Sequence, residues 1–456
     1  MDGIQLEVFM EKFYLKKITL LNYRRFENET FQFNPRMNVL IGKNAAGKTT
    51  VLEAVNVLLG AYLAAYKKYV PSRFVYNITD NDIRLKTAGM TTHGTTLPST
   101  VPQFPCTIGC RMQWDTKEIS YSRTLEKEGS RTKFAGTNPM QPEVLKWENA
   151  IAKADGSDAE QAYPLILYLS SARLWNENRG SEIKSVPNRT DAYQRCLDKK
   201  RSSQSAFEYI KLLRNIASEE NAGKQFPAYD AIMEAVRYSL EDELQAGQSV
   251  EYASRYSEIA VKNADGKLIQ FASLSDGYRN VMKIVTDIAT KMCILNPHLE
   301  GQALVKTPGV VVIDELDLSL HPTWQKRIVR ILKKLFPQIQ FICATHSPFI
   351  IQSLEPGELL ALDTVQDEEY SGQSIEDIAE DIMQVPMPHY SEKKEQMYKA
   401  AEKYFGALNA NVDAEKLEAL KEELDVLSAE YSDNPAYNAF LKQKYLERKA
   451  ETEDTE

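Results

Sequence analysis

The chain has 456 residues, of which 43% are hydrophobic, so it is long enough for two or three domains and can bury a sizeable core. Its net charge of −9 is unevenly distributed: residues 366–456 contain 23 acidic and 10 basic residues, whereas residues 1–365 contain 41 acidic and 45 basic residues. This balance argues against the tail as a DNA-facing surface but not against the rest of the chain. No stretch approaches the ~20 apolar residues of a membrane helix, the beginning lacks an export signal, and the five cysteines form no paired framework. We therefore expect a cytoplasmic protein without a membrane span.

The first third of the sequence predicts short strands around a glycine-rich loop. Apolar runs predict strands at residues 15–21 and 31–33, and a third strand at 37–41 leads into the loop. A helix with a broad apolar side is expected from Lys48 onward. Antiparallel strands joined by a polar hairpin are expected between residues 104 and 134, and the run PLILYL, residues 164–169, is typical of a buried strand.

The remaining sequence alternates helices and strands before it becomes purely helical. Residues 175–247 are rich in charge and predict helices, and strand patterns return before Leu274. A long helix, a strand at 309–313, a second helix and a strand at 340–344 follow. This alternation predicts an α/β fold with a parallel sheet covered by helices, plus an antiparallel β subdomain. We expect one domain formed by two separate segments, residues 1–175 and 251–365, with a helical insertion at 176–250 and an acidic helical tail at 366–456.

The strongest motif is a phosphate-binding loop, called here the P-loop, between the apolar strand at 37–41 and the following helix. Its glycines let backbone amides point at phosphates, aided by the start of the helix. Lys48 supplies positive charge at the β and γ phosphates, and the Thr49 hydroxyl is a ligand for Mg²⁺. The motif therefore predicts ATP and Mg²⁺ as cofactors, bound by Gly42, Lys43, Asn44, Ala45, Ala46, Gly47, Lys48, Thr49 and the adjacent Thr50.

Two carboxylates end the apolar strand at 309–313. Desolvated carboxylates are costly unless they meet a cation, so Asp314 and Glu315 predict a functional site. Asp314 would hold Mg²⁺, mainly through water. Glu315 would act as the general base that polarises the attacking water, which implies hydrolysis and not binding alone.

His346 follows the strand at 340–344, at the sheet edge where parallel sheets bind ligands. A histidine in such a place is often only a hydrogen-bonded structural residue. Because it follows the two-carboxylate strand, we favour a catalytic sensor that contacts the γ-phosphate and the water.

The stretch SLSDGYRN, residues 273–280, places a glycine–hydroxyl turn at the start of a helix. One interpretation is a helix cap, in which Ser275 or Asp276 satisfies free backbone amides. The same geometry also binds anions, which leaves a second phosphate contact open. We call residues 274–277 the signature turn.

The order of these motifs resembles the ABC-type ATPase heads of the SMC, RecF and OLD proteins. The resemblance rests on the P-loop, the signature turn, Asp314-Glu315, DLSLHP at 317–322 and His346. It implies that two heads dimerise around two ATP molecules, with Ser275 and Gly277 completing the site of the partner and Asp317 near the nucleotide. The segment NYRRF, residues 22–26, is similar to a family segment that lies near the nucleotide, which implies a contact from Arg24.

Within this class the sequence looks most like the PtuA ATPases of the Septu anti-phage system. The likeness rests on the helical insertion, on DELDLSLHPTWQ at 314–325, and on the tail segments 374–378 and 386–388. It implies an HNH nuclease subunit, PtuB, as partner and a link to DNA. Two alternatives stay open: a RecF- or SMC-like ATPase for repair or chromosome maintenance, and a scaffold that binds ATP with little turnover.

The tail, the Q-loop and a leucine repeat carry weaker signals. About 90 residues follow Leu362, and they predict helices without the strands that the nuclease domain of OLD proteins needs. No nuclease site is therefore expected in this chain. The glutamine of the family's Q-loop is not identified: Gln113 and the segment 170–173, with Arg173 facing the γ-phosphate, are both candidates. Leucines 417, 420, 424 and 427 with Tyr431 form a heptad seam, which packs within its own domain or dimerises.

Cysteine, histidine and basic clusters receive mainly structural interpretations. Cys106 and Cys110 have no further ligands nearby, so buried thiols are favoured over zinc. Structural roles are expected for three histidines, His93, His321 and His389. Two basic clusters either contact DNA phosphates or are simply solvated surface. These clusters are Lys67, Lys68 and Arg73, and Lys199, Lys200 and Arg201.

Overall fold

The computed structural model describes residues 12–66, 71, 74–92, 95–134, 138–153, 162–174, 186–199, 204–220, 226–241, 244, 248–253, 255–256, 258–363, 370, 372–385, 388, 391–409 and 413–429. The chain divides into two compact units, Met1–Ile375 and Glu376–Glu456, which are described separately. Within the described residues, no helix combines the length and apolar character needed to cross a membrane.

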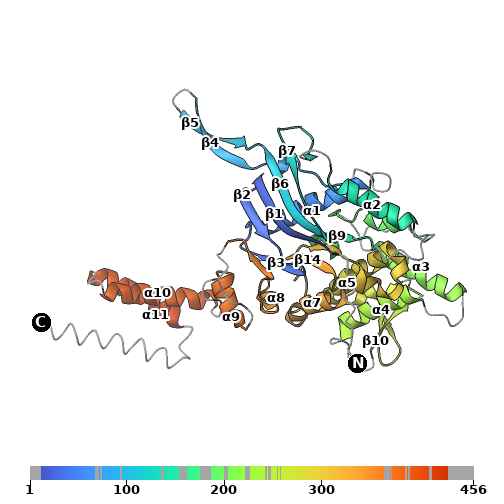
Figure 1. Cartoon of the computed structure of the whole chain (residues 1–456). Coiled ribbons are helices and arrows are strands. Elements are labelled where there is room, and N and C mark those ends of the chain that lie inside the picture. Colours follow the sequence, from blue (N-terminus) through green and yellow to red (C-terminus); the bar gives the residue numbers. More distant parts are fainter. Residues whose placement is uncertain are drawn as a thin grey trace, which may run out of the picture. The chain divides into compact units, whose positions relative to one another are not determined.

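A five-stranded parallel sheet forms the centre of the first unit (Figure 1). Its order is β15-β3-β14-β13-β9, and each neighbouring pair is parallel. Strands covered on both faces are mostly apolar, which is why β9 and β13 are continuous apolar runs, while β3 and β14 each contain one buried polar residue, Asn38 and Gln340. The predicted strands are confirmed as β3 (Met37–Ile41), β9 (Leu165–Leu169), β13 (Gly309–Ile313) and β14 (Ile339–Ala344), and the short β15 (Leu359–Ala361) was not predicted.

A second, antiparallel sheet of order β2-β1-β6-β7-β8 confirms the predicted β subdomain. In β1, buried and less buried residues alternate, as expected for a sheet with one covered face. The hairpin β4–β5 was not predicted, because its threonines, glycine and prolines show no apolar alternation. The bounds are β1 (Phe13–Tyr23), β2 (Phe26–Gln32), β4 (Leu85–Thr92), β5 (Thr95–Pro102), β6 (Cys106–Trp114), β7 (Lys117–Leu125) and β8 (Lys133–Phe134).

One glutamine joins the two sheets. The pairing of β1 with β6 shifts register between Leu15 and Lys17, and the backbone N–H and C=O of Leu15 lie beside this irregularity. Gln340 of β14 meets both groups: its Oε1 accepts from Leu15 N and its Nε2 donates to Leu15 O, each at 2.8 Å. Gln340 is fully buried, so these bonds are shielded from water.

Helices fill the remaining layers. Helix α1 contacts strands of both sheets and is buried on nearly all sides, which explains its broad apolar surface. Helix α5 contacts β9, α4 and α7. The helices are α1 (Lys48–Ala65), α2 (Met140–Lys153), α3 (Gln204–Glu220), α4 (Pro227–Leu240), α5 (Asp276–Leu295), α6 (Ala303–Lys306), α7 (Pro322–Leu335) and α8 (Pro348–Gln352), and a small sheet comprises β10 (Ser249–Ala253), β11 (Glu258–Lys262) and β12 (Leu268–Ile269).

The second unit contains a helical hairpin, α10 (Glu392–Asn409) and α11 (Ala414–Ala429), preceded by the short α9 (Ile375–Asp377) and a π-helical turn at Ile378–Ile382. Leu424 is buried in a cluster with α10 residues such as Met397 and Tyr404. Leu417, Leu420 and Leu427 pack against the same cluster. The predicted heptad seam is therefore occupied within this unit, except for Tyr431, which lies outside the described residues.

Candidate nucleotide-binding site

Three adjacent strands bring the predicted site together. The P-loop follows β3, His346 follows β14 and Asp314 follows β13, and β14 lies between the other two. Because the three strands are parallel, their carboxyl ends share one edge of the sheet. The sequence motifs, of which Gly42 and His346 are 304 positions apart, thus lie along one edge of the sheet. The neighbouring strands β3 and β14 are labelled in Figure 1.

The P-loop has the open backbone that phosphate binding requires. Gly42, Ala45 and Gly47 have φ values of 150°, 67° and 104°. Lys48 is 8% exposed, and its Nζ donates to Gly42 O at 2.6 Å and Lys43 O at 3.2 Å. Burial lowers the pKa of Lys48, partly offset by nearby carboxylates. A cavity of about 390 Å³ beside the loop is lined by Arg24, Arg25, Asn44, Ala45, Gly47, Lys48, Thr49, Thr50 and His346.

Thr49 and Asp314 fit a Mg²⁺ site. The Thr49 hydroxyl lies 3.4 Å from both carboxylate oxygens of Asp314, so hard oxygen donors from two loops converge. Burial, and next the charge of Glu315, raise the pKa of Asp314. A buried carboxylate in this setting is stabilised by a nearby cation, which is the property expected of a Mg²⁺ ligand.

Glu315 is held in an unusual backbone conformation. Its φ is 51°, in the left-handed region that costs a residue with a side chain about 1–2 kcal/mol. Its side chain is exposed, in contrast to the buried Asp314 beside it. The turn therefore directs the two adjacent carboxylates into different environments, as a metal ligand and a base would require.

Asp317 positions the histidine loop. Its Oδ1 accepts from Thr345 Oγ1 at 2.6 Å and from His346 N at 3.3 Å. The resemblance implies that Asp317 lies near the nucleotide. In the structure its carboxylate forms the two hydrogen bonds within the chain described above. Partial burial, and next the charge of Lys48, lower the pKa of His346, so the neutral imidazole is favoured at the cavity.

The NYRRF segment lies against the P-loop. Arg24, at φ 50°, forms ion pairs with Glu53 and Asp82, and Arg25 donates to the Ala45 carbonyl. Both arginines line the cavity, whereas sequence reasoning selected only Arg24. The tight turn at residues 22–25, in which Asn22 and Arg24 have positive φ, brings both arginines to the cavity, and such a turn leaves no clear sequence signal.

The signature turn begins α5 without a side-chain cap. Ser275 is the N-cap residue, but its side chain makes no capping hydrogen bond, and the residue is exposed. A Cβ at Gly277 would lie 3.2 Å from Ser319 O, so the helix start packs on the turn after Glu315. Neither Ser275 nor Gly277 is among the described residues that line the P-loop cavity.

The two Q-loop candidates both make hydrogen bonds within the chain. Gln113 lies on β6, and its amide donates to Asp115 O at the β6–β7 turn. Arg173 is 3% exposed and donates to acceptors within the chain, including Asp314 O at 2.6 Å and Glu315 O at 2.7 Å. These bonds hold its guanidinium on the carbonyl side of the carboxylate turn, and a contact of Arg173 with the γ-phosphate stays a prediction.

Asp363 is a site residue that the sequence did not indicate. Its Oδ2 accepts from Lys43 N at 2.7 Å and lies 3.0 Å from the position of a Cβ on Gly42. This carboxylate follows β15 and anchors the first turn of the P-loop. Sequence reasoning missed it because no motif relates two positions 320 residues apart.

The remaining candidates have structural surroundings. Cys106 and Cys110 are buried in β6, and His321 caps α7 by accepting from Thr323 N. Lys199 forms an ion pair with Glu53, so its charge is engaged inside the chain. Residues 67, 68, 73, 93, 200, 201, 386, 387 and 389, which carried predictions, lie outside the described residues.

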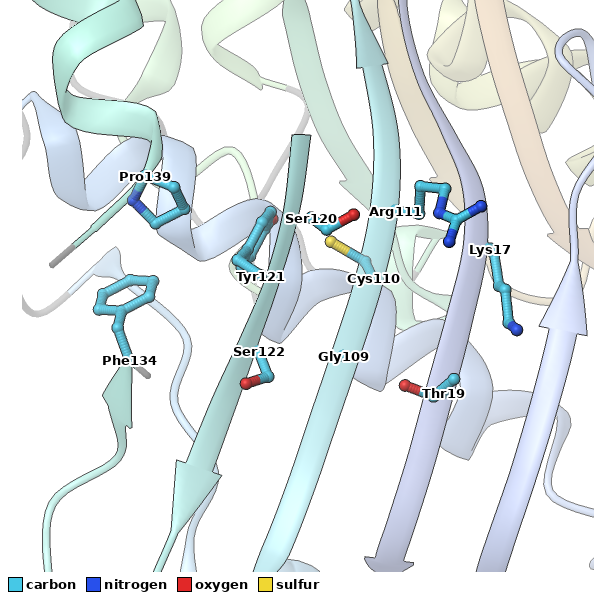
Figure 2. A pocket seen from close by; sticks show the side chains of 10 residues that line it. All are labelled: Lys17, Thr19, Gly109, Cys110, Arg111, Ser120, Tyr121, Ser122, Phe134 and Pro139. Carbon is cyan, nitrogen blue, oxygen red and sulfur yellow. The ribbon is translucent and has the colours of Figure 1, made fainter. Parts of the chain in front are cut away.

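A separate hollow of about 460 Å³ lies on the antiparallel sheet (Figure 2). Lys17 and Arg111 flank one side of it, and Phe134 and Pro139 the other. Arg111 is paired with Glu118 at 3.3 Å. None of the predicted site residues lines this hollow, so the chemistry is assigned to the P-loop cavity.

Gly47→Ala is expected to weaken ATP binding at least about tenfold. The new Cβ would lie 2.7 Å from Phe26 Cζ and 2.9 Å from Arg25 Cδ, so the loop or the NYRRF segment must move. Overpacking of this kind costs about 1–3 kcal/mol. The measurement is the Kd of a fluorescent ATP analogue.

Gly129→Ala is the matched control for that variant. Gly129 also has a positive φ, 67°, but a Cβ there would have no neighbour within 4 Å. It therefore carries the backbone strain without the collision, and ATP affinity should stay unchanged. Equal affinity of the Gly47→Ala and wild-type proteins would show that this contact does not shape the site.

Comparisons with known proteins agree with this geometry. A family model described as "AAA domain" matches residues 17–245, half of the chain, and a second AAA domain model matches residues 168–352. The Retron Vc95 probable ATPase of Vibrio cholerae serotype O1 biovar El Tor is 24% identical over 388 residues, covering 75% of this chain and 72% of that protein.

The predicted likeness to Septu proteins is confirmed. The Septu protein PtuA of Bacillus mycoides (strain KBAB4) is 24% identical over 367 residues, which are 77% of this chain and 42% of that protein. Among solved structures, the SMC head domain from Thermotoga maritima matches 76% of this chain and 94% of its own, with 15% identity and a TM-score of 0.39.

Proposed function

Because the chain belongs to the AAA domain family, we propose that it binds ATP with Mg²⁺ in the P-loop cavity and hydrolyses it. The observation that carries this proposal is the convergence of Thr49 and Asp314 at 3.4 Å beside the buried Lys48. A cation-binding pair, a phosphate-binding loop and an adjacent carboxylate are the parts that phosphoryl transfer to water needs.

The residues divide the work by their surroundings. Lys48 and the P-loop amides hold the phosphates, and Thr49 and Asp314 would hold Mg²⁺, which neutralises phosphate charge when it is bound. Glu315, exposed at the end of β13, takes a proton from the attacking water. His346, kept neutral by its surroundings, orients that water and the γ-phosphate. Arg24 and Arg25 contact the nucleotide at the open side of the cavity.

We further propose that two chains close over two ATP molecules. The exposed Ser275 hydroxyl, unused as a cap, and the start of α5 form an anion-binding surface that lies outside the P-loop cavity of the same chain. A second chain related by two-fold symmetry would present this surface to that cavity. Each chain would then supply the base to one site and the signature turn to the other.

Mixing Lys48→Ala with Ser275→Arg chains is expected to restore about a quarter of the wild-type ATPase activity, although each variant alone is inactive. Random pairing gives mixed dimers in half of the cases, and each would keep one of its two shared sites. The measurement is phosphate release after the chains are mixed and allowed to exchange.

Mixing Lys48→Ala with Glu315→Gln is the matched control. These substitutions lie in the same half of the site, so every shared site in the mixed dimer carries one of them. No recovery is expected. Recovery in both mixtures, or in neither while both variants fold and dimerise, would contradict the shared arrangement.

We propose that this ATPase controls an HNH nuclease subunit, the PtuB-like partner, in anti-phage defence on DNA. The proposal is supported by the similarity to Septu PtuA, which covers 42% of that protein. The acidic second unit is a proposed partner-binding or regulatory region, as its helical hairpin offers charged outer faces. Affinity purification from the native host should yield an HNH protein. Recovery of replication or repair proteins instead would favour the RecF- or SMC-like alternative.

A further inference from the structure

A buried arginine connects the end of β9 to both the carboxylate turn and the signature helix α5. Arg173 Nη1 donates to Ser170 O at 3.1 Å and to Asp314 O at 2.6 Å, and Nη2 donates to Glu315 O at 2.7 Å. Its Nε donates to Asn280 Oδ1 at 2.8 Å. A guanidinium with 3% exposure is costly unless its donors are satisfied, and here these donors meet fixed acceptors.

The two bonds to the turn act on a strained backbone. Glu315 keeps φ at 51° although it is not a glycine, and this left-handed conformation decides where its carboxylate points. The carbonyl groups of Asp314 and Glu315 lie beyond the end of β13, where no neighbouring strand pairs with them. Arg173 holds both carbonyls and so compensates for the strain of the turn.

Asn280 brings α5 into the same network. It is fully buried in the second turn of the helix, accepts from Arg173, and donates through Nδ2 to Leu318 O at 2.6 Å. At the start of the helix, Gly277 leaves only 3.2 Å between a hypothetical Cβ and Ser319 O. The signature helix therefore touches the 315–319 turn at several points and cannot shift without moving it.

We propose that Arg173 and Asn280 are positioning residues that link the signature turn to the general base Glu315 of the same chain. The inference rests on the proposed ATPase function and deepens it. Because α5 packs on the 315–319 turn, the Asn280–Arg173 pair sets the backbone of Glu315 through this helix. The link acts within one chain and therefore affects the site to which that chain supplies the base.

Arg173→Lys and Asn280→Ala test this link. Lysine keeps the charge but cannot reach Asn280 and both carbonyls at once. Each variant should lower kcat at least about tenfold while the Kd for ATP stays within about twofold, because neither residue lines the cavity. The double variant should be no slower than the slower single variant, because the two residues act as one unit.

Arg123→Lys is the matched control for loss of a buried arginine. Arg123 is also 3% exposed and donates to a backbone carbonyl, that of Val57, and to a side-chain amide, that of Asn77, away from the carboxylate turn. All variants are assayed at a temperature where circular dichroism shows them folded. A role in folding alone predicts equal kcat for the Arg173 and Arg123 variants.

The mixed dimer locates the effect. In the Lys48→Ala and Ser275→Arg pair, the one intact site takes its base from the Ser275→Arg chain. Arg173→Lys on that chain should lower the restored activity at least about tenfold. On the Lys48→Ala chain, which supplies the base only to the inactive site, the same substitution should leave the restored activity within about twofold. Unchanged kcat in the Arg173→Lys homodimer overturns the link while leaving the ATPase function intact. A wild-type protein without ATP turnover overturns both.

Discussion

Replacing Glu315 by glutamine is expected to lower the kcat for ATP hydrolysis about 10²–10³-fold, the size of a lost general base. Glutamine has nearly the same shape, and the side chain is exposed, so neither packing nor the left-handed turn should change. ATP affinity should remain, since Lys48, Thr49 and Asp314 are untouched. Single-turnover phosphate release and the Kd of a fluorescent ATP analogue together separate chemistry from binding.

Glu234→Gln serves as the matched control, because Glu234 is a surface residue whose side chain is 75% exposed on α4. It should hydrolyse ATP at the wild-type rate. Wild-type activity in the Glu315→Gln protein would exclude Glu315 as the base. If neither the wild type nor the variant hydrolyses ATP, the chain is a nucleotide-binding scaffold and not an enzyme.

Lys48→Ala is expected to weaken ATP binding about 10–100-fold and to reduce turnover to background. A hydrogen bond to a charged group contributes about 1.5–3 kcal/mol, and the ammonium of Lys48 is already held at the loop by Gly42 O and Lys43 O. Little reorganisation is therefore needed when the phosphates arrive. Isothermal titration with ATP and Mg²⁺ gives the affinity directly.

Lys291→Ala separates this effect from the loss of any buried lysine. Lys291 is equally buried, at 8% exposure, and also donates to a backbone carbonyl, that of Ala192. Its removal should reduce thermal stability and leave ATP affinity unchanged. Equal affinities of the Lys48→Ala and wild-type proteins would remove the P-loop from the proposed function.

Four strands of the parallel sheet and the row of motifs along its edge were predictable from the sequence, whereas the short β15 was not. β13 is apolar over its whole length, as expected for a strand buried on both faces, and the first polar residue after it marks the strand end. Asp314 could therefore be placed at the edge, and Thr49 was placed by its position after the P-loop glycines. Their 3.4 Å approach follows from β3 and β13 being parallel in one sheet.

The contacts that hold the site were not predictable in the same way. Arg173 and Asn280 are 107 residues apart and meet because β9 and α5 pack together. Their hydrogen-bond partners are mostly backbone carbonyls, which every residue has. No sequence pattern therefore predicts that Arg173 and Asn280 meet. For the same reason the sequence left Arg173 as one of two Q-loop candidates: an arginine after a strand at a ligand-binding edge suggests a phosphate contact, and its bonds to backbone carbonyls inside the chain have no sequence pattern.

Gln340 carries a further consequence for how this protein can vary. Its side-chain amide bonds to Leu15 as a peptide group of a neighbouring strand would: its oxygen accepts from Leu15 N and its nitrogen donates to Leu15 O, each at 2.8 Å. Glutamate would set a negative charge against a carbonyl, and leucine would leave two buried peptide groups unsolvated. Position 340 therefore needs a side chain that both accepts and donates a hydrogen bond. We expect other residues there to be tolerated only if the irregular pairing of β1 near Leu15 changes at the same time.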